Sequence, residues 1–284
     1  MCIRDRFTVV ESYNNSKSGI VLSMSSENNI TNNRVFNNSE YGIHLFQSLN
    51  NTIADIITYN NDIGILVAWS SINNNLINIT THDNVRDGIQ VYRSSDYNNL
   101  SSITSYNNRF GLYLVYTNNI SLINTTLYNN QQGGMRLTNA SDNDLFNVTS
   151  YNNQDVGIRL GLANNNNLDS ITTHDNRLDG FYIIESSGNV VQNSTASNNN
   201  RSGILLERDS INNTFSNIQI NSYPTNISFT YASGSFSGNL SIDGVDNPPE
   251  DPQLYQNISK YVNCLLYTSP SPRDLSTSRM PSSA

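Results

Sequence analysis

The stretch from residue 151 to residue 173, YNNQDVGIRLGLANNNNLDSITT, is one copy of a unit that recurs along most of the 284-residue chain. Each copy carries a glycine at an equivalent place, and consecutive glycines lie 22 to 24 residues apart. The nine glycines are Gly19, Gly42, Gly64, Gly88, Gly111, Gly134, Gly157, Gly180 and Gly203. A fixed period of this length indicates a stacked architecture, in which neighbouring units share one core because a single unit cannot bury its apolar face alone.

The glycine of each copy is followed by a triplet whose first and third residues are apolar. In the quoted copy the triplet is Ile158-Arg159-Leu160, and its middle position varies freely among the nine copies. Alternation with a period of two is typical of a strand with one buried face. The triplets therefore predict nine short strands that stack into one parallel sheet.

The second part of the unit is rich in Asn, Ser and Thr and carries pairs of apolar residues three positions apart. The pairs are Ile53 and Ile56, Leu76 and Ile79, Leu100 and Ile103, Leu145 and Val148, Leu168 and Ile171, and Phe215 and Ile218. Spacing of three is compatible with a helix, but Asn, Ser and Thr compete with helical hydrogen bonds. We expect two very short strands with a corner between them.

The third part is the corner Tyr-Asn-Asn, as at Tyr151-Asn152-Asn153, which becomes His-Asp-Asn at His82 and His174. Asn tolerates the left-handed conformation that a tight corner needs. Asn side chains stacked at one height are also expected to hydrogen-bond to one another along the stack as a ladder.

These features predict an all-β fold: a single-stranded right-handed parallel β-helix of nine to ten coils of about 23 residues. At a strand spacing of ~4.8 Å, nine coils make a rod of about 40 Å. The alternative is a leucine-rich repeat, whose period overlaps but whose pattern is L-x-x-L-x-L-x-x-N with a helical return leg. The G-I-x-L strand and the Asn/Thr-rich return leg favour the β-helix.

The G-I-x-L…N-N-x-I-x-x-I-T-x-Y-N-N units resemble the right-handed parallel β-helix repeats (PbH1 repeats) of the NosD-like and pectate-lyase-like superfamily. The resemblance extends over about residues 13–220. It implies the fold, and a place in a secreted or cell-surface protein of bacterial or archaeal origin. It does not single out an activity.

The ends of the chain differ from the repeats. Residues 1–6 (MCIRDR) and 264–284 (CLLYTSPSPRDLSTSRMPSSA) resemble a translated sequencing-library adapter, as expected of a metagenomic fragment, and both cysteines fall in them. We expect the β-helix over residues 7–244, with an irregular last coil from Asn221 on. A Pro/acidic linker at 245–252 and the start of a truncated second domain at 253–263 would follow.

Composition limits the partners. The chain has a net charge of −8 and only 13% charged residues, and no basic stripe of the kind that neutralises phosphates, so nucleic acid is not an expected partner. No apolar run approaches the length of a membrane span. We expect this chain to be an extracellular or cell-surface domain of a larger protein. Its partners would then include the other domains of that protein.

The middle residues of the triplets predict a column of outward side chains. Within it Tyr113, Arg136, Arg159 and Tyr182 follow one another on consecutive coils, and Trp69 and Tyr116 lie just beyond the strand ends. Aromatic rings stack on sugar rings and Arg forks bind carboxylates. We therefore expect a rigid scaffold with a glycan-recognition surface, for an acidic polysaccharide above all. An ordinary solvated sheet face, with Arg and aromatic pairs between strands, is the plainer interpretation.

An enzyme acting on polysaccharide (a lyase, hydrolase or epimerase) is the alternative function. Its catalytic pair would be Glu185 and Glu207, on adjacent coils near the column, because sugar hydrolases use paired carboxylates. A calcium-dependent lyase would need several stacked acidic ligands, and no column offers three in succession. The three histidines, His44, His82 and His174, are spread over the chain, so we expect neither a metal nor another cofactor.

Overall fold

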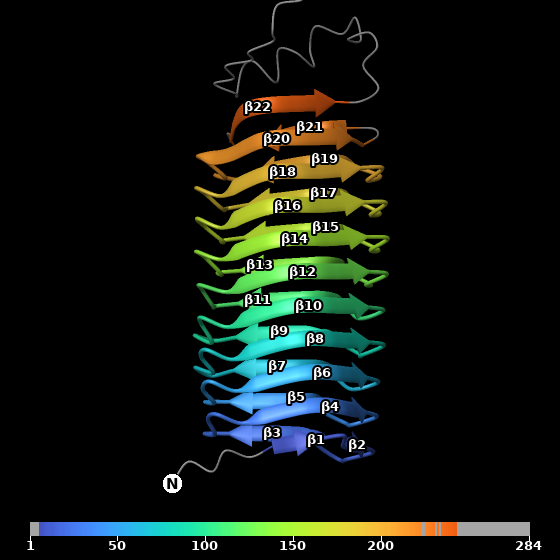
Figure 1. The fold of residues 1–284 in the computed structure, drawn as a ribbon. Helices are drawn as coiled ribbons and strands as arrows, with labels where there is room; N and C mark the ends of the chain where they lie inside the picture. The colour runs from blue at the N-terminus through green and yellow to red at the C-terminus, as the bar shows by residue number, and fades with distance from the viewer. Residues whose placement is uncertain (1–5, 223–224, 231, 233, 243–284) are drawn as a thin grey trace, which may run out of the picture.

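The computed structural model describes residues 6–222, 225–230, 232 and 234–242. The linker and second domain expected at 245–263, and the segment 264–284, lie outside the described residues. Within the described residues every regular element is a β-strand. The strands stack one above another into a rod (Figure 1). No helix long and apolar enough to cross a membrane occurs in this part of the chain. The all-β prediction is confirmed, and the strand-built return leg excludes the leucine-rich repeat.

Each coil contributes strands to two sheets, one strand to each from β3 onward, and every strand pair in them is parallel. Sheet A consists of β1 (Arg6–Thr8), β2 (Glu11–Tyr13), β4 (Asn29–Phe36), β6 (Thr52–Tyr59), β8 (Asn75–His82), β10 (Asn99–Tyr106), β12 (Ser121–Tyr128), β14 (Asp144–Tyr151), β16 (Asn167–His174), β18 (Val190–Ser197), β20 (Asn213–Asn221) and β22 (Gly234–Ile242). Sheet B consists of β3 (Ile20–Ser23), β5 (Tyr41–Phe46), β7 (Ile63–Ala68), β9 (Ile89–Tyr92), β11 (Phe110–Val115), β13 (Gly133–Thr138), β15 (Val156–Gly161), β17 (Asp179–Ile184), β19 (Ser202–Glu207) and β21 (Thr225–Thr230).

The nine predicted triplets form consecutive strands of sheet B, as expected. Their first and third residues point into the core: Ile158 and Leu160 are fully buried, and Ile89 and Val91 likewise. Ile20, in β3 at the end of the described sheet, is only partly buried. Alternation in the sequence thus identified the inner face of this sheet correctly.

The Asn-rich return leg forms one bent strand of sheet A rather than the two strands that we expected. In β6 the residue Asp55 adopts a left-handed conformation with φ of 56° between the buried Ile53 and Ile56. One left-handed residue turns the strand, so two residues three positions apart both face the core. The pairing with β8 continues on both sides of the bend, which keeps the leg a single element.

Left-handed residues also make the other corners of each coil. The coil that contains β14 turns at Asn139, Asp142, Asn147 and Asn152, with φ values of 48°, 56°, 54° and 53°. Asn and Asp reach this region more easily than other residues because their short side chains bond locally. Asn is the commonest residue at three of these corners, which accounts for part of the high Asn content, whereas the corner after the sheet B strand carries Asn only at Asn139 among the described coils.

The second Asn of the Tyr-Asn-Asn corner forms the expected ladder. Both the backbone N–H and the side-chain Nδ2 of Asn153 donate to Oδ1 of Asn176 on the next coil, at 3.1 and 2.9 Å. The fully buried Asn members of this ladder run from Asn61 to Asn199. A second buried Asn ladder precedes the sheet A strands and is interrupted by Ile120.

The repeated glycine is required by the space beside this ladder. A Cβ built on Gly157 would lie 2.7 Å from the carbonyl oxygen of Gly180 and 2.8 Å from Nδ2 of Asn176. Both atoms are held by the stacking of the coils, so neither can move away cheaply. The repeated glycine therefore marks, in each coil, the position at which the Asn ladder packs against the strand of sheet B.

A row of aromatic rings runs along the outer edge of sheet A. Consecutive ring centroids lie 4.8 to 5.1 Å apart with nearly parallel planes. The members are Tyr13, Phe36, Tyr59, His82, Tyr106, Tyr128, Tyr151 and His174. Two histidines thus take the place of tyrosine in the stack.

The last described coil is irregular, as expected from the loss of the G-I-x-L pattern after Ile220. β21 pairs with β19 and β22 pairs with β20, so the helix continues through this segment. The register between β20 and β22 shifts between Ser216 and Ile218.

The steric role of the glycine column can be tested by the substitution Gly157→Ala. We expect it to destabilise the protein by about 1–3 kcal/mol, because an added methyl group overpacks a site with immobile neighbours. The matched control is Gly161→Ala, where a Cβ would meet no atom closer than 3.7 Å. Urea unfolding followed by circular dichroism measures both. Equal stability of the two variants would contradict the steric account.

Candidate functional site

The predicted outward column exists and lies on the exposed face of sheet B. The strand register places Tyr113 beside Arg136, Arg136 beside Arg159, and Arg159 beside Tyr182. The four residues belong to β11, β13, β15 and β17 and are half-buried. Neighbouring strands lie ~4.8 Å apart, so two guanidinium groups rise side by side between two phenol rings.

Aromatic rings orient the two arginines. The guanidinium carbon of Arg136 lies 5.3 Å from the ring centroid of Tyr113, and that of Arg159 lies 4.9 Å from the ring of Tyr182. Nε of Arg136 also donates a hydrogen bond to Oγ1 of Thr138 at 3.1 Å. In the part of the chain that the structure describes, neither arginine forms an ion pair.

Other arginines on the same side of the helix are neutralised by carboxylates. Arg109 pairs with Asp87, and Arg201 with Asp179, and both carboxylates are fully buried. Burial raises the pKa of Asp87, and the hydrogen bond from Arg109 opposes that rise. These pairs hold the corner before sheet B together, whereas within the described residues Arg159 donates no hydrogen bond and Arg136 donates only through Nε, so their remaining N–H groups are available for a ligand.

Arg136 and Arg159 border a pocket of about 230 Å³. Phe110, Gln132 and Asp155 also line it. Burial raises the pKa of the Asp155 carboxyl, while the positive charges of Arg159 and Arg201 act in the opposite direction. The column of Tyr113, Arg136, Arg159 and Tyr182 has no acidic member, but Asp155, in the turn before β15, lies at the edge of the column.

The two glutamates of the alternative catalytic pair have separate partners. Glu207 accepts a hydrogen bond from the hydroxyl of Tyr182 at 2.7 Å, whereas Glu185 lies 3.7 Å from Arg208. The register pairs Glu207 with Ile184, so the glutamates are offset by one residue. Burial, followed by the bond to Glu207, raises the pKa of Tyr182.

Trp69 and Tyr116 lie at corners that follow β7 and β11, outside the arginine pocket. Their side chains are 44% and 55% exposed, and both residues are left-handed, with φ of 57° and 51°. Such conformations are uncommon for bulky residues. The guanidinium of Arg93 covers the Trp69 ring at 4.2 Å.

Sequence reasoning missed Phe110, Gln132 and Asp155, because it followed the columns through the strands and not through the turns before them. A signal existed: the position two residues before the repeated glycine is charged in most copies, as at Arg109, Asp155 and Arg201. Charged side chains at equivalent positions of consecutive coils lie close together, because the coils stack directly on one another.

The histidines lie apart from this pocket. Nδ1 of His82 and Nδ1 of His174 each contact the carboxylate of the following aspartate, at 2.6 and 2.7 Å. His44 packs edge-on against Tyr41, and burial lowers its pKa. The described residues contain no group of three or more His, Cys, Asp or Glu placed to hold a metal ion.

The model of the family described as "right handed beta helix region" matches residues 6–105 and 87–243. The chain belongs to this right-handed β-helix family. No curated protein matches the chain.

Solved structures with the same fold include two epimerases and a tailspike. The A-module of mannuronan C-5 epimerase AlgE6 from Azotobacter vinelandii is 16% identical, with a TM-score of 0.63 over 82% of this chain and 77% of that one. The periplasmic alginate epimerase AlgG is 13% identical, with a TM-score of 0.63 over 83% and 62%. Tailspike protein 2 of Escherichia coli O157:H7 bacteriophage CAB120 is 14% identical, with a TM-score of 0.66 over 85% and 42%. At these identities the likeness concerns the fold.

The raised pKa of Asp155 leads to a prediction about stability. An acid whose pKa is raised above 3.8 on folding contributes stability that is present at low pH and is lost as the pH rises through the folded-state pKa. We expect Asp155→Asn to raise the urea midpoint at pH 7, by an amount that shrinks as the pH is lowered towards 4.

The charge-matched control is Asp144→Asn, at an exposed position of β14. We expect it to change the midpoint little. A loss of stability in Asp155→Asn at pH 7, or a gain that grows on acidification, would contradict the assigned cause.

Proposed function

We propose that this β-helix domain binds an acidic polysaccharide along the outer face of sheet B, as a rigid recognition surface of an extracellular or cell-surface protein. The observation that carries the proposal is the pair Arg136 and Arg159. They lie side by side and form no ion pair with any residue that the structure describes, while Arg109 and Arg201 nearby are neutralised.

The chemistry of the column matches such a ligand. Two like charges on neighbouring strands repel each other, and an anion bound between them removes that cost. Guanidinium groups bind carboxylates through two parallel hydrogen bonds. Tyr113 and Tyr182 at either end add ring surfaces, which suit the apolar faces of sugars, and Tyr113 adds a hydroxyl group, whereas the hydroxyl of Tyr182 donates to Glu207.

The similar structures support this direction. Two of them are named for enzymes of mannuronan and alginate, polysaccharides that carry a carboxylate on each sugar. A long linear anion also fits a face on which equivalent positions recur at a constant rise. The net charge of −8 is no obstacle, because the attraction is local to the two arginines.

Catalysis on such a polysaccharide is the second candidate. One feature of the pocket favours catalysis. Asp155, an acid with a raised pKa, borders the same cavity as Arg136 and Arg159, whose guanidinium groups could hold a substrate carboxylate. Glu185 and Glu207 are weaker candidates for catalysis, since Arg208 and Tyr182 engage them separately. Product analysis after incubation with polyuronates distinguishes an enzyme from a binding module.

Titration calorimetry with uronate oligosaccharides tests the binding site. We expect saturable binding that weakens with salt and falls at least roughly a hundredfold in the double variant Arg136→Ala/Arg159→Ala, because two charge-assisted contacts are lost.

The control Lys17→Ala/Arg34→Ala removes the same charge from exposed positions outside the arginine pocket and should bind like the wild type. No heat with any acidic oligosaccharide, or equal binding by both double variants, would exclude this face as the site.

A further inference from the structure

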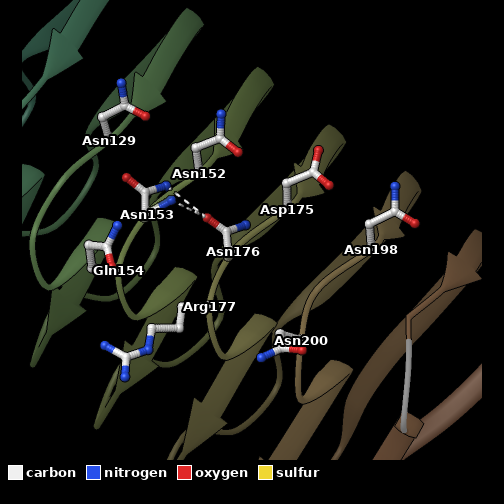
Figure 2. Close-up of a pocket in the computed structure, with 9 residues that line it drawn as sticks. All are labelled: Asn129, Asn152, Asn153, Gln154, Asp175, Asn176, Arg177, Asn198 and Asn200. Carbon is white, nitrogen blue, oxygen red and sulfur yellow. Dashed lines mark hydrogen bonds between the residues drawn. The ribbon is translucent and has the colours of Figure 1, made fainter.

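A second groove lies at the corner where sheet A turns toward sheet B, on the coils that contain β12, β14, β16 and β18. Its volume is about 420 Å³. The ladder residues Asn153 and Asn176 form its floor (Figure 2). One row of side chains precedes the floor in sequence and another follows it, so the groove runs along the helix between two walls.

The walls consist of polar side chains that are not engaged by the protein. None of six wall side chains makes a side-chain hydrogen bond or ion pair within the described part of the chain. They are Asn129, Asn152, Gln154, Arg177, Asn198 and Asn200. The remaining wall residue, Asp175, contacts Nδ1 of His174. The groove is therefore surrounded by free donors and acceptors.

Lower coils show that this availability is not a necessary property of the repeat. There the equivalent residues satisfy one another: Asn60 donates to Asn37 at 3.1 Å, and Asn107 donates to Asp83 at 3.0 Å. The wall that precedes the floor in sequence is thus closed by internal bonds at these lower positions and left open on the upper coils.

We propose that the corner groove is a second binding site, for a neutral oligosaccharide. A primary amide both donates and accepts hydrogen bonds, as a sugar hydroxyl does, so rows of amides match a chain of hydroxyl groups. Each wall carries one polar side chain per coil, at a rise of ~4.8 Å, and five of the seven wall side chains are amides, which suits an extended polymer lying parallel to the helix. The charged wall residues, Asp175 and Arg177, have opposite signs.

Other ligand classes fit the groove less well. A polyanion would meet only one cation, Arg177, beside the carboxylate of Asp175. An extended peptide is recognised through pockets for alternate side chains, usually apolar ones, and no apolar side chain lines this groove. The corner groove therefore differs in chemistry from the arginine pocket, and the two proposals stand or fall separately.

The test uses the full chain and a panel of neutral pentasaccharides: cello-, manno-, xylo- and chitopentaose, with a Gly/Ser peptide as the protein-like probe. The groove variant is Asn152→Gly/Asn198→Gly. Glycine suits the left-handed φ values of 53° and 52° at these positions, so the amides are removed without straining the corners. The matched control Asn60→Gly/Asn107→Gly makes the same change at φ values of 54° and 56°, outside the groove.

We expect at least one pentasaccharide to bind saturably in calorimetry, with little dependence on salt. Binding should fall at least about tenfold in the groove variant, as two hydrogen bonds are lost, and remain unchanged in the control. Absence of binding by the whole panel, equal losses in both variants, or binding of the peptide alone would overturn the proposal. Retained binding of acidic oligosaccharides by the groove variant would show that the arginine pocket is intact.

Discussion

The buried asparagine ladder is the interaction on which the other features of this β-helix depend. Each rung links a backbone N–H and a side-chain amide of one coil to the amide oxygen of the next, as from Asn153 to Asn176. A corner buried between two sheets would otherwise leave backbone groups without partners, which costs more than an ordinary hydrogen bond contributes. The ladder satisfies these groups and fixes the height of every coil.

The second buried ladder, which precedes the sheet A strands, has one interruption, and this interruption shows what a rung must provide. At Ile120 an aliphatic side chain takes the place of the amide, and its backbone N–H still donates to Oδ1 of Asn143. On the coil below, Nδ2 of Asn98 donates to the carbonyl oxygens of Ser71 and Ser95 instead. A buried rung can therefore be apolar when the neighbouring amides find carbonyls within reach.

Much of the fold was readable from the sequence because the fold is periodic. The glycine spacing, the apolar alternation and the Asn corners each report a contact between adjacent coils, so residues such as Gly157 and Ile158 could be placed without coordinates. The arginine column followed from the same register. The bend at Asp55 was missed because a spacing of three fits both a corner between two strands and a single left-handed residue inside one.

The turn residues were harder to predict because their surroundings depend on the path of the chain and not on its period. Asp155 stands two residues before Gly157 in the sequence, yet it borders the pocket of Arg136 from the coil above. The polar corner groove was equally hidden: its amides have the same sequence signature as those that bond to one another on the lower coils. Composition reveals that amides are present, but only the structure shows which of them are free.

The connection from residue 152 to residue 155 joins the two candidate sites. Asn152, Asn153 and Gln154 line the corner groove, and Asp155 lines the arginine pocket. The ladder holds this connection in place through Asn153, so both surfaces are rigid for the same reason. A stack of coils thereby separates two chemistries over a few residues: two guanidinium groups lie on the strands of sheet B, and mostly amide side chains lie at the corner. The arrangement needs no movement of the scaffold, because each coil presents its side chains at a height that the buried amides have already set.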